Sequence, residues 1–138
     1  MPDPLRYLAG AWRLTRRIED VTAGLTGDFS GTGRFSPDGA GLRYAERGEL
    51  VLGSHRGPAW RAYRYRPDGA GRLVVEFDDG RYFHDLDLTG GYWQVTHPCR
   101  ADEYGGAFRV LSADLWTQDW RVHGPAKNQR LFTEFRRY

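Results

Sequence analysis

The chain has 138 residues, of which 40% are hydrophobic and 28% are charged. This length and composition predict one globular domain over residues 1–138 and exclude an intrinsically disordered chain. No apolar run approaches the about 20 residues of a membrane-spanning helix, and the first residues lack the basic and apolar regions of a secretory signal peptide. We therefore expect a cytoplasmic protein with no membrane partner. The single cysteine, Cys99, fits that compartment, because disulfides are rare in a reducing cytosol.

The charges are mixed along the chain, with 20 Lys and Arg against 18 Asp and Glu and a net charge of +2. The basic groups are short, as at Arg13, Arg16 and Arg17, so no run is long enough to grip nucleic-acid phosphates. Nucleic acid is therefore not an expected partner, and a weak polyanion-binding strand face is kept as an alternative. All basic residues except Lys127 are arginine, a bias typical of GC-rich bacterial genomes. Lys127 is kept as a ligand-binding candidate, because lysine and arginine differ in pKa and geometry.

Pro4–Ala9 is the one segment that predicts a helix. Asp3 can cap it, Pro4 suits its first position and Gly10 can end it. After it, turn-forming residues recur regularly and separate segments of alternating polarity that are typical of strands. Ten strands are predicted, near Ala11–Glu19, Asp28–Phe35, Leu42–Leu52, Trp60–Arg66, Arg72–Phe77, Tyr82–Leu88, Tyr92–His97, Ala107–Leu111, Leu115–Val122 and Arg130–Arg137.

The links between these strands are too short for crossover helices, so neighbouring strands should pair antiparallel. Ten strands with little helix predict an all-β fold, a closed antiparallel up-and-down β-barrel of about 8–10 strands with a short N-terminal helix. A β-sandwich is the alternative. A barrel of this size has room for one small ligand. The aromatic content of 14% suits both a barrel core and a ligand pocket.

Gly10-Ala11-Trp12 stands where the helix meets the first strand, and a basic residue, Arg136 or Arg137, lies near the end of the last strand. This combination resembles the Gly-x-Trp and late-Arg signature of the calycin superfamily of lipocalin-like barrels. The resemblance implies that Trp12 closes one end of the barrel and that the arginine packs over its indole in a cation–π contact.

The chain from Phe83 onward also resembles a bacterial lipocalin-like family of uncharacterised function. The stretches that carry this resemblance are Phe83-His84, residues 97–104 and residues 120–127. The chain departs from secreted lipocalins, which usually have a signal peptide and disulfides. The segment Asp20–Gly27 is too short for the two-helix lid of fatty-acid-binding proteins. Transport of extracellular lipids is therefore not expected.

Two histidines are the first candidates for catalysis. Alternation places His84 on the face of Leu86 and Leu88, opposite Phe83, so its imidazole should point into the barrel. Among apolar neighbours its charged form is disfavoured, which suits a base near neutral pH. His97 is expected to face inward near a strand end, where ligand contacts collect. The alternative for His84 is a core histidine whose hydrogen bonds a neighbour satisfies.

Further polar candidates accompany them. Asp102 and Tyr104 follow His97 closely, and the three side chains would form an acid–base group at a barrel mouth; the alternative is a polar loop in which Asp102 makes a turn. Glu46 would face inward unless Gly48 introduces a bulge, and the bulge with an exposed carboxylate is favoured. Cys99 is disfavoured as a nucleophile because no oxyanion-forming glycine turn accompanies it.

On the predicted strand Leu115–Val122, the side chains of Trp116, Gln118 and Trp120 share a face that we expect to point into the barrel. Gln118 is the polar group on that face that would orient a ligand. Trp93 shares its strand face with His97. The strand near Trp60 would supply further residues around the ligand, and the strand register decides whether Tyr63 or Tyr65 faces inward. The predicted ligand-binding residues are thus Trp60, Tyr65, Trp93, Trp116, Gln118, Trp120 and Lys127.

No metal site is predicted, because His84 and His97 are not accompanied by a zinc-type spacing. Gly31-Thr32-Gly33 opens no helix, so no dinucleotide site is expected. No organic cofactor is expected either. The alternative is haem, held by His84 or His97 as the axial ligand, as in the nitrobindin-like calycins that the chain distantly resembles.

Three functions follow. The first is a cofactor-independent acid–base enzyme of small-molecule biosynthesis, which cyclises, isomerises or decarboxylates an aromatic metabolite inside the barrel. The second is a non-catalytic module that binds haem or another hydrophobic ligand. The third, a polyanion- or protein-binding surface built from arginines, ranks lowest. The expected partners are a small aromatic or hydrophobic ligand and, as an option, a second copy in a homodimer.

Overall fold

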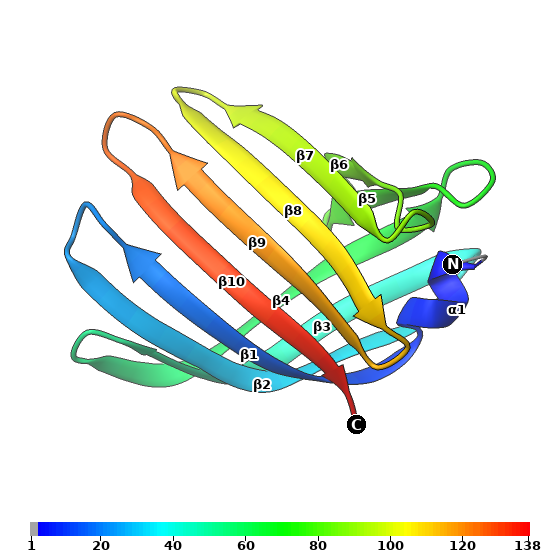
Figure 1. The fold of residues 1–138 in the computed structure, drawn as a ribbon, viewed down its shortest axis with the longest axis horizontal. Helices are drawn as coiled ribbons and strands as arrows, with labels where there is room; N and C mark the ends of the chain where they lie inside the picture. Colours follow the sequence, from blue (N-terminus) through cyan, green and yellow to red (C-terminus); the bar gives the residue numbers. More distant parts are fainter. Residues whose placement is uncertain (1–2) are drawn as a thin grey trace.

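In residues 3–138, ten antiparallel strands and one short helix make up the fold (Figure 1). The computed structural model describes these residues except for the side chain of Cys99, so the nucleophile hypothesis for that residue lies outside what is described. The helix is α1 (Pro4–Leu8), and the strands are β1 (Gly10–Asp20), β2 (Leu25–Asp38), β3 (Gly41–Leu52), β4 (His55–Pro67), β5 (Leu73–Phe77), β6 (Tyr82–Leu86), β7 (Tyr92–Cys99), β8 (Asp102–Ser112), β9 (Leu115–His123) and β10 (Asn128–Arg137).

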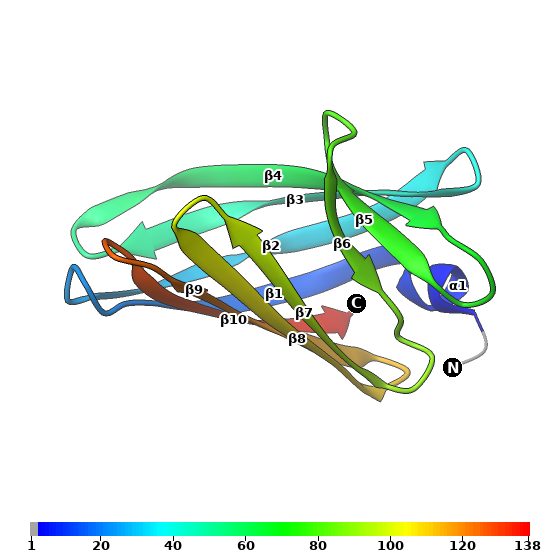
Figure 2. The ribbon, with the colours of Figure 1, turned by 90° about the horizontal axis from the view of Figure 1, so that it is seen from above.

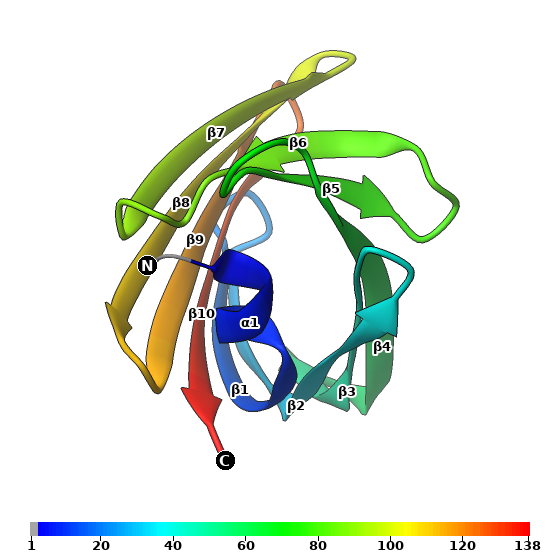
Figure 3. The same cartoon turned by 90° about the vertical axis from the view of Figure 1, so that its right-hand side faces the viewer.

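The strands form a single sheet in the order β6-β5-β4-β3-β2-β1-β10-β9-β8-β7. Strands that follow one another in the chain pair with each other, apart from β6 and β7, and β1 also pairs with β10. Viewed end-on, the sheet curves until β6 and β7 approach each other (Figure 3). The prediction of an all-β up-and-down barrel with a short N-terminal helix is confirmed, and the barrel is nearly closed.

All ten predicted strands are present, and several are longer than predicted. For example, β2 begins at Leu25 rather than Asp28, and β4 begins at His55 rather than Trp60. The sequence favours a bulge at Gly48 on β3. Gly48 instead stays in register between Gly31 and Ala59, because backbone ladders need no side chain.

The seam between β6 and β7 is bridged by a side chain rather than by a strand ladder. The indole Nε1 of Trp93 on β7 donates a hydrogen bond to the carbonyl oxygen of Asp85 on β6, at 3.0 Å. Seen from above, β5 and β6 lie at the same end of the molecule as α1 (Figure 2). Because β6 and β7 stand at opposite ends of the sheet order, no strand ladder joins them, and the seam is the part of the described wall with the fewest backbone hydrogen bonds.

The helix α1, together with Trp12 and Arg137, closes one end of the barrel. As predicted, Asp3 caps α1, accepting a hydrogen bond from the backbone N–H of Arg6 at 3.2 Å. The buried indole of Trp12 donates to the carbonyl oxygen of Leu8 at 2.8 Å. The guanidinium carbon of Arg137 lies 3.9 Å from the centre of the Trp12 ring, which is the cation–π contact that the resemblance implied. Within residues 3–138, no helix has the length and hydropathy needed to cross a membrane.

An aromatic core fills the barrel next to this closed end. Trp116 stacks on Phe135 with ring centres 4.0 Å apart, and its ring also meets Trp12 edge-on at 6.3 Å. Along β1 the inward positions run from Trp12 through Leu14 to Arg16, and Arg16 is about 13 Å from Trp12 at 3.3 Å per residue. The inward side chains thus change from apolar to polar along the barrel, and the cavity lies at the polar end.

Candidate functional site

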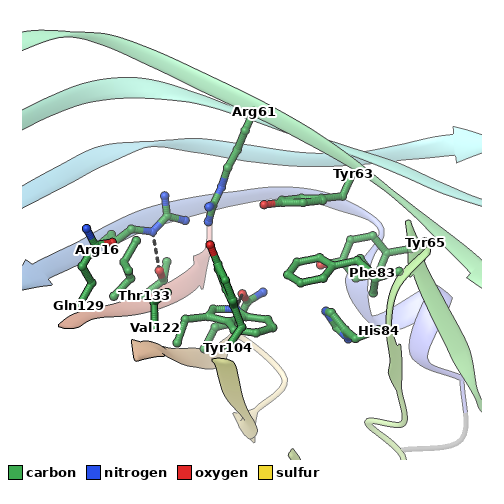
Figure 4. Close-up of a pocket in the computed structure, with 14 residues that line it drawn as sticks. Arg16, Arg61, Tyr63, Tyr65, Phe83, His84, Tyr104, Val122, Gln129 and Thr133 are labelled. Carbon is green, nitrogen blue, oxygen red and sulfur yellow. Dashed lines mark hydrogen bonds between the residues drawn. The ribbon is translucent and has the colours of Figure 1, made fainter. Parts of the chain in front are cut away.

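The barrel contains a partly open cavity of about 190 Å³. Figure 4 shows the side chains that line it. They come from seven strands and combine aromatic rings with a few polar groups: Arg16, Arg61, Tyr63, Tyr65, Val75, Phe83, His84, Tyr104, Gln118, Trp120, Val122, Gln129, Leu131 and Thr133. Such a mixture is typical of small-molecule pockets, which are mostly apolar and contain few polar groups for orientation.

Three rings, from Tyr63, Phe83 and Trp120, form what we call the aromatic wall. Phe83 is nearly parallel to Trp120, with ring centres 5.3 Å apart, and it is also nearly parallel to Tyr63 at 5.9 Å. Trp120 lies over Gly106, where an added Cβ would come within 2.9 Å of the indole. The wall therefore lines this part of the cavity with aromatic surface, on which an aromatic ligand can pack.

The orientation of Phe83 corrects the sequence prediction, which placed it opposite His84. Both side chains line the cavity. The cause is an irregularity in the pairing of β5 with β6: Val75 pairs with His84, whereas Glu76 pairs with Tyr82. Phe83 is thus the extra residue of a bulge, and a bulge re-aims the side chain that strict alternation would have turned outward.

A buried ion pair lies behind the opposite side of the cavity. The guanidinium of Arg16 donates to both oxygens of Glu46, at 2.7 and 2.9 Å, and its Nε donates to Thr133 at 2.7 Å. The hydroxyl of Tyr44 donates to the same carboxylate at 2.6 Å. This bidentate geometry fixes both side chains, because a planar guanidinium matches a carboxylate in one orientation.

The burial of Glu46 corrects the expectation that it is exposed. Gly48 makes no bulge, so inward parity runs unbroken through Leu42, Tyr44 and Glu46, and Glu46 is only 3% exposed. Burial would raise the pKa of Glu46, but the hydrogen bond from Arg16 and the charges of Arg61 and Arg16 lower it below its ordinary value. The carboxylate is therefore ionised at neutral pH and stands behind Arg16 rather than in the cavity lining.

Arg61 was missed by the sequence analysis and lines the cavity. Its Nε lies 3.1 Å from Oε2 of Glu46 but makes no hydrogen bond, and its guanidinium stands 5.5 Å from the centre of the Tyr63 ring. Parity along β4 is the signal that could have found it, because Arg61, Tyr63 and Tyr65 share one face. We call Arg16, Glu46 and Arg61 the charged end of the site.

His84 brings an uncharged imidazole to the cavity. Its Nδ1 lies 2.8 Å from the carbonyl oxygen of Asp85. A carbonyl only accepts, so Nδ1 carries the proton. Burial lowers the pKa of His84 to about 4, so at neutral pH the other ring nitrogen, Nε2, is an acceptor. The inward orientation expected for this residue is confirmed by its burial.

The other predicted catalytic residues divide into two groups. Tyr104 lines the cavity. His97 lies beside it, with its ring 5.3 Å from Phe83 and 6.4 Å from Tyr104, outside the lining. Asp102 forms an ion pair with Lys127 at 3.6 Å, and neither residue reaches the cavity. His84 and Tyr104 therefore line the same cavity, whereas Asp102 and Lys127 lie outside it.

The predicted ligand-binding residues also divide. Tyr65, Gln118 and Trp120 line the cavity, whereas Trp116 belongs to the core and Trp93 to the seam, as described above. Trp60 is 68% exposed on the outer face of β4, because the neighbouring Arg61 faces inward. Within the described residues, no group of three or more His, Cys, Asp or Glu side chains is placed to hold a metal ion.

Solved structures with similar folds include three barrels. An S-type phycobiliprotein lyase from Guillardia theta matches with a TM-score of 0.66 at 8% identity, covering 97% of this chain and 90% of that one. A protein of unknown function from the DUF3598 family of Nostoc punctiforme matches with a TM-score of 0.63 at 15% identity, covering 97% of this chain and 49% of that one. The barrel EF1p2_mFAP2b, bound to DFHBI, matches with a TM-score of 0.52 at 15% identity, covering 100% and 99%. At these identities the likeness is one of fold.

No curated protein matches the sequence. The family model of DUF6314, a family of unknown function, covers residues 8–137, which include every strand and every residue of the cavity. The chain therefore belongs to the DUF6314 family.

Proposed function

We propose that this protein binds one small aromatic molecule inside its barrel. The observation that carries the proposal is the cavity of about 190 Å³ with the aromatic wall of Tyr63, Phe83 and Trp120 on one side. A cavity of about 150 Å³ accommodates benzene, so this one has room for a single or fused ring with a short substituent. Gln118 and Tyr104 add polar groups that would fix the orientation of a bound ring.

The fold supports this proposal in a general way. One similar barrel is described as bound to DFHBI and another is a phycobiliprotein lyase. The contact between Arg137 and Trp12 further supports a relationship with the calycins. Haem is a weaker proposal, because a macrocycle of four pyrroles needs far more room than a cavity of this volume.

Acid–base catalysis on the bound molecule is the second candidate function, and His84 is the observation that favours it. Its protonated Nδ1 is tied to Asp85, so Nε2 can accept a proton or a hydrogen bond from a ligand. With a pKa of about 4 the imidazole is a weak base at neutral pH, and it would take a proton as charge develops in a transition state. Tyr104 would supply the acid. Cyclisation, isomerisation and decarboxylation all fit such a pair, with no organic cofactor.

Binding is tested first. The freshly purified protein is examined by native mass spectrometry for a retained aromatic molecule. Titration calorimetry with one-ring and two-ring aromatic compounds then measures affinity. We expect one-to-one binding that Trp120→Ala weakens about tenfold, since stacking on that indole is lost. Trp60→Ala removes an exposed indole and should leave affinity unchanged. Absence of binding, or equal loss in both variants, would overturn the proposal.

Catalysis is tested on whichever compound binds. Turnover is followed by mass spectrometry for the wild type, His84→Asn and Tyr104→Phe, with His123→Asn as a control at an exposed histidine of β9. We expect turnover to fall at least about 100-fold in the first two variants and to persist in the control. Equal turnover in all four proteins would contradict acid–base catalysis by His84 and Tyr104.

A further inference from the structure

The charged side chains that line the cavity are both cationic at neutral pH. They are Arg16 and Arg61, and the one carboxylate beside them, Glu46, stands behind the lining. One carboxylate balances one guanidinium. The imidazole of His84 adds no charge at neutral pH. The charged end therefore carries one surplus positive charge next to an aromatic wall.

The hydrogen bonds show which arginine carries this surplus. Arg16 already uses all three guanidinium nitrogens, which donate to Glu46 or Thr133. Arg61 forms no hydrogen bond with any described residue, although Glu46 lies 3.1 Å from its Nε. Its Nε is buried beside Glu46, so the N–H groups of its two terminal nitrogens are the ones available to an acceptor inside the cavity. Figure 4 shows this side chain extending from β4 into the cavity.

A ligand that covers the guanidinium of Arg61 must bring an acceptor for its terminal N–H groups. The side chain of Arg61 is 38% exposed, so water reaches part of it. A ligand that displaces this water must replace its hydrogen bonds or lose affinity. A planar carboxylate does so best, because its two oxygens match the guanidinium fork. A single surplus charge and a cavity of about 190 Å³ favour a compact monoanion over a phosphate dianion.

We propose that the occupant is an aromatic carboxylic acid, bound as its anion, with its ring on the aromatic wall and its carboxylate on the guanidinium of Arg61. Arg16 and Glu46 hold the charged end rigid, and Gln118, which accepts a hydrogen bond from the indole of Trp120, is a further polar residue of the lining. This inference rests on the proposed function, because it names the class of molecule that the same cavity takes.

The test compares acids with their neutral amides of nearly equal shape. The probes are trans-cinnamate with cinnamamide and indole-3-acetate with indole-3-acetamide, titrated calorimetrically at pH 7. We expect each acid that binds to do so at least about tenfold more tightly than its amide. In Arg61→Gln this preference should fall to about twofold or less, while the amide affinity stays the same. Arg61→Lys keeps the charge without the fork and should retain part of the preference.

Arg64→Gln is the matched control, since it removes the same charge from the outer face of the same strand. It should keep the full preference. Thermal unfolding of each variant confirms that it is folded. Equal binding of acid and amide, or an unchanged preference in Arg61→Gln, would overturn the carboxylate inference and leave aromatic binding standing. Failure of both acids and both amides to bind would instead contradict the proposed function, and this inference with it.

Discussion

Arg16 and Glu46, which are 30 residues apart in the chain, form a bidentate ion pair inside the barrel with N–O distances of 2.7 and 2.9 Å. Only 5% and 2% of their side chains are exposed. Tyr44 and Thr133 satisfy further atoms of the pair. A buried pair of this kind is most consequential when one partner is removed, because the other is left as an unpaired charge.

Glu46→Gln should therefore destabilise the fold strongly. It leaves Arg16 and Arg61 as two buried or half-buried cations without a neighbouring anion. We expect a loss of about 3–5 kcal/mol in the free energy of unfolding, measured by urea denaturation. Glu49→Gln on the same strand breaks an exposed pair with Arg56 and should cost under about 1 kcal/mol. Similar small losses of unfolding free energy in both variants would show that the pair of Arg16 and Glu46 does not stabilise this end of the barrel.

The buried imidazole of His84 predicts that stability depends on pH. Its pKa is about 4 in the folded protein, against an ordinary value of 6.5, so between these values the unfolded chain binds the additional proton. Stability is full above pH 6.5 and falls as the pH is lowered toward 4, by about 3 kcal/mol for this group alone.

His84→Asn should remove most of this slope, and unfolding curves between pH 7 and pH 4 measure it. His123→Asn should keep the slope, because His123 is exposed. A wild-type stability that does not change between pH 6.5 and pH 4.5 would contradict the buried neutral imidazole.

Arg137 ties the last strand to the closed end of the barrel. It lies over the Trp12 indole at 3.9 Å and donates to the carbonyl oxygen of Tyr7 at 2.7 Å. Arg137→Met keeps the aliphatic packing and loses both interactions, and we expect a cost of about 2 kcal/mol. Arg136→Met, at the exposed neighbouring position, should cost about 0.5 kcal/mol or less. Chemical denaturation measures the free energy of unfolding of both variants. An equal loss in the two variants would argue against a closing role for Arg137.

The seam between β6 and β7 should open more readily than any other junction in the described barrel. Trp93→Phe removes the indole donor to the carbonyl oxygen of Asp85 and should cost about 1 kcal/mol. Hydrogen exchange followed by mass spectrometry should show faster exchange in β6 and β7, with β1 and β10 unchanged. Tyr92→Phe, on the exposed side of β7, should leave exchange as in the wild type. Uniform acceleration in all strands after Trp93→Phe would mean that the seam has no separate opening.

Several features of this protein could be predicted from local sequence. The spacing of turn residues predicted ten strands and hence the meander, because each antiparallel link is short and local. The cap at Asp3 and the pairing of Trp12 with a late arginine were also predictable. Gln118 and Trp120 were placed on the cavity side of β9, since that strand alternates without interruption.

The charged end and the shape of the cavity depended on the tertiary structure. Glu46 is buried only because β3 runs past Gly48 without a bulge, and Phe83 faces the cavity only because β6 has one. One shifted residue reverses the facing of a side chain in a strand, and no local pattern reports that shift. Arg16 and Arg61 meet Glu46 through strand pairings that join distant parts of the chain. Strand composition thus determined which elements form, and the register between strands decided which charges share the interior.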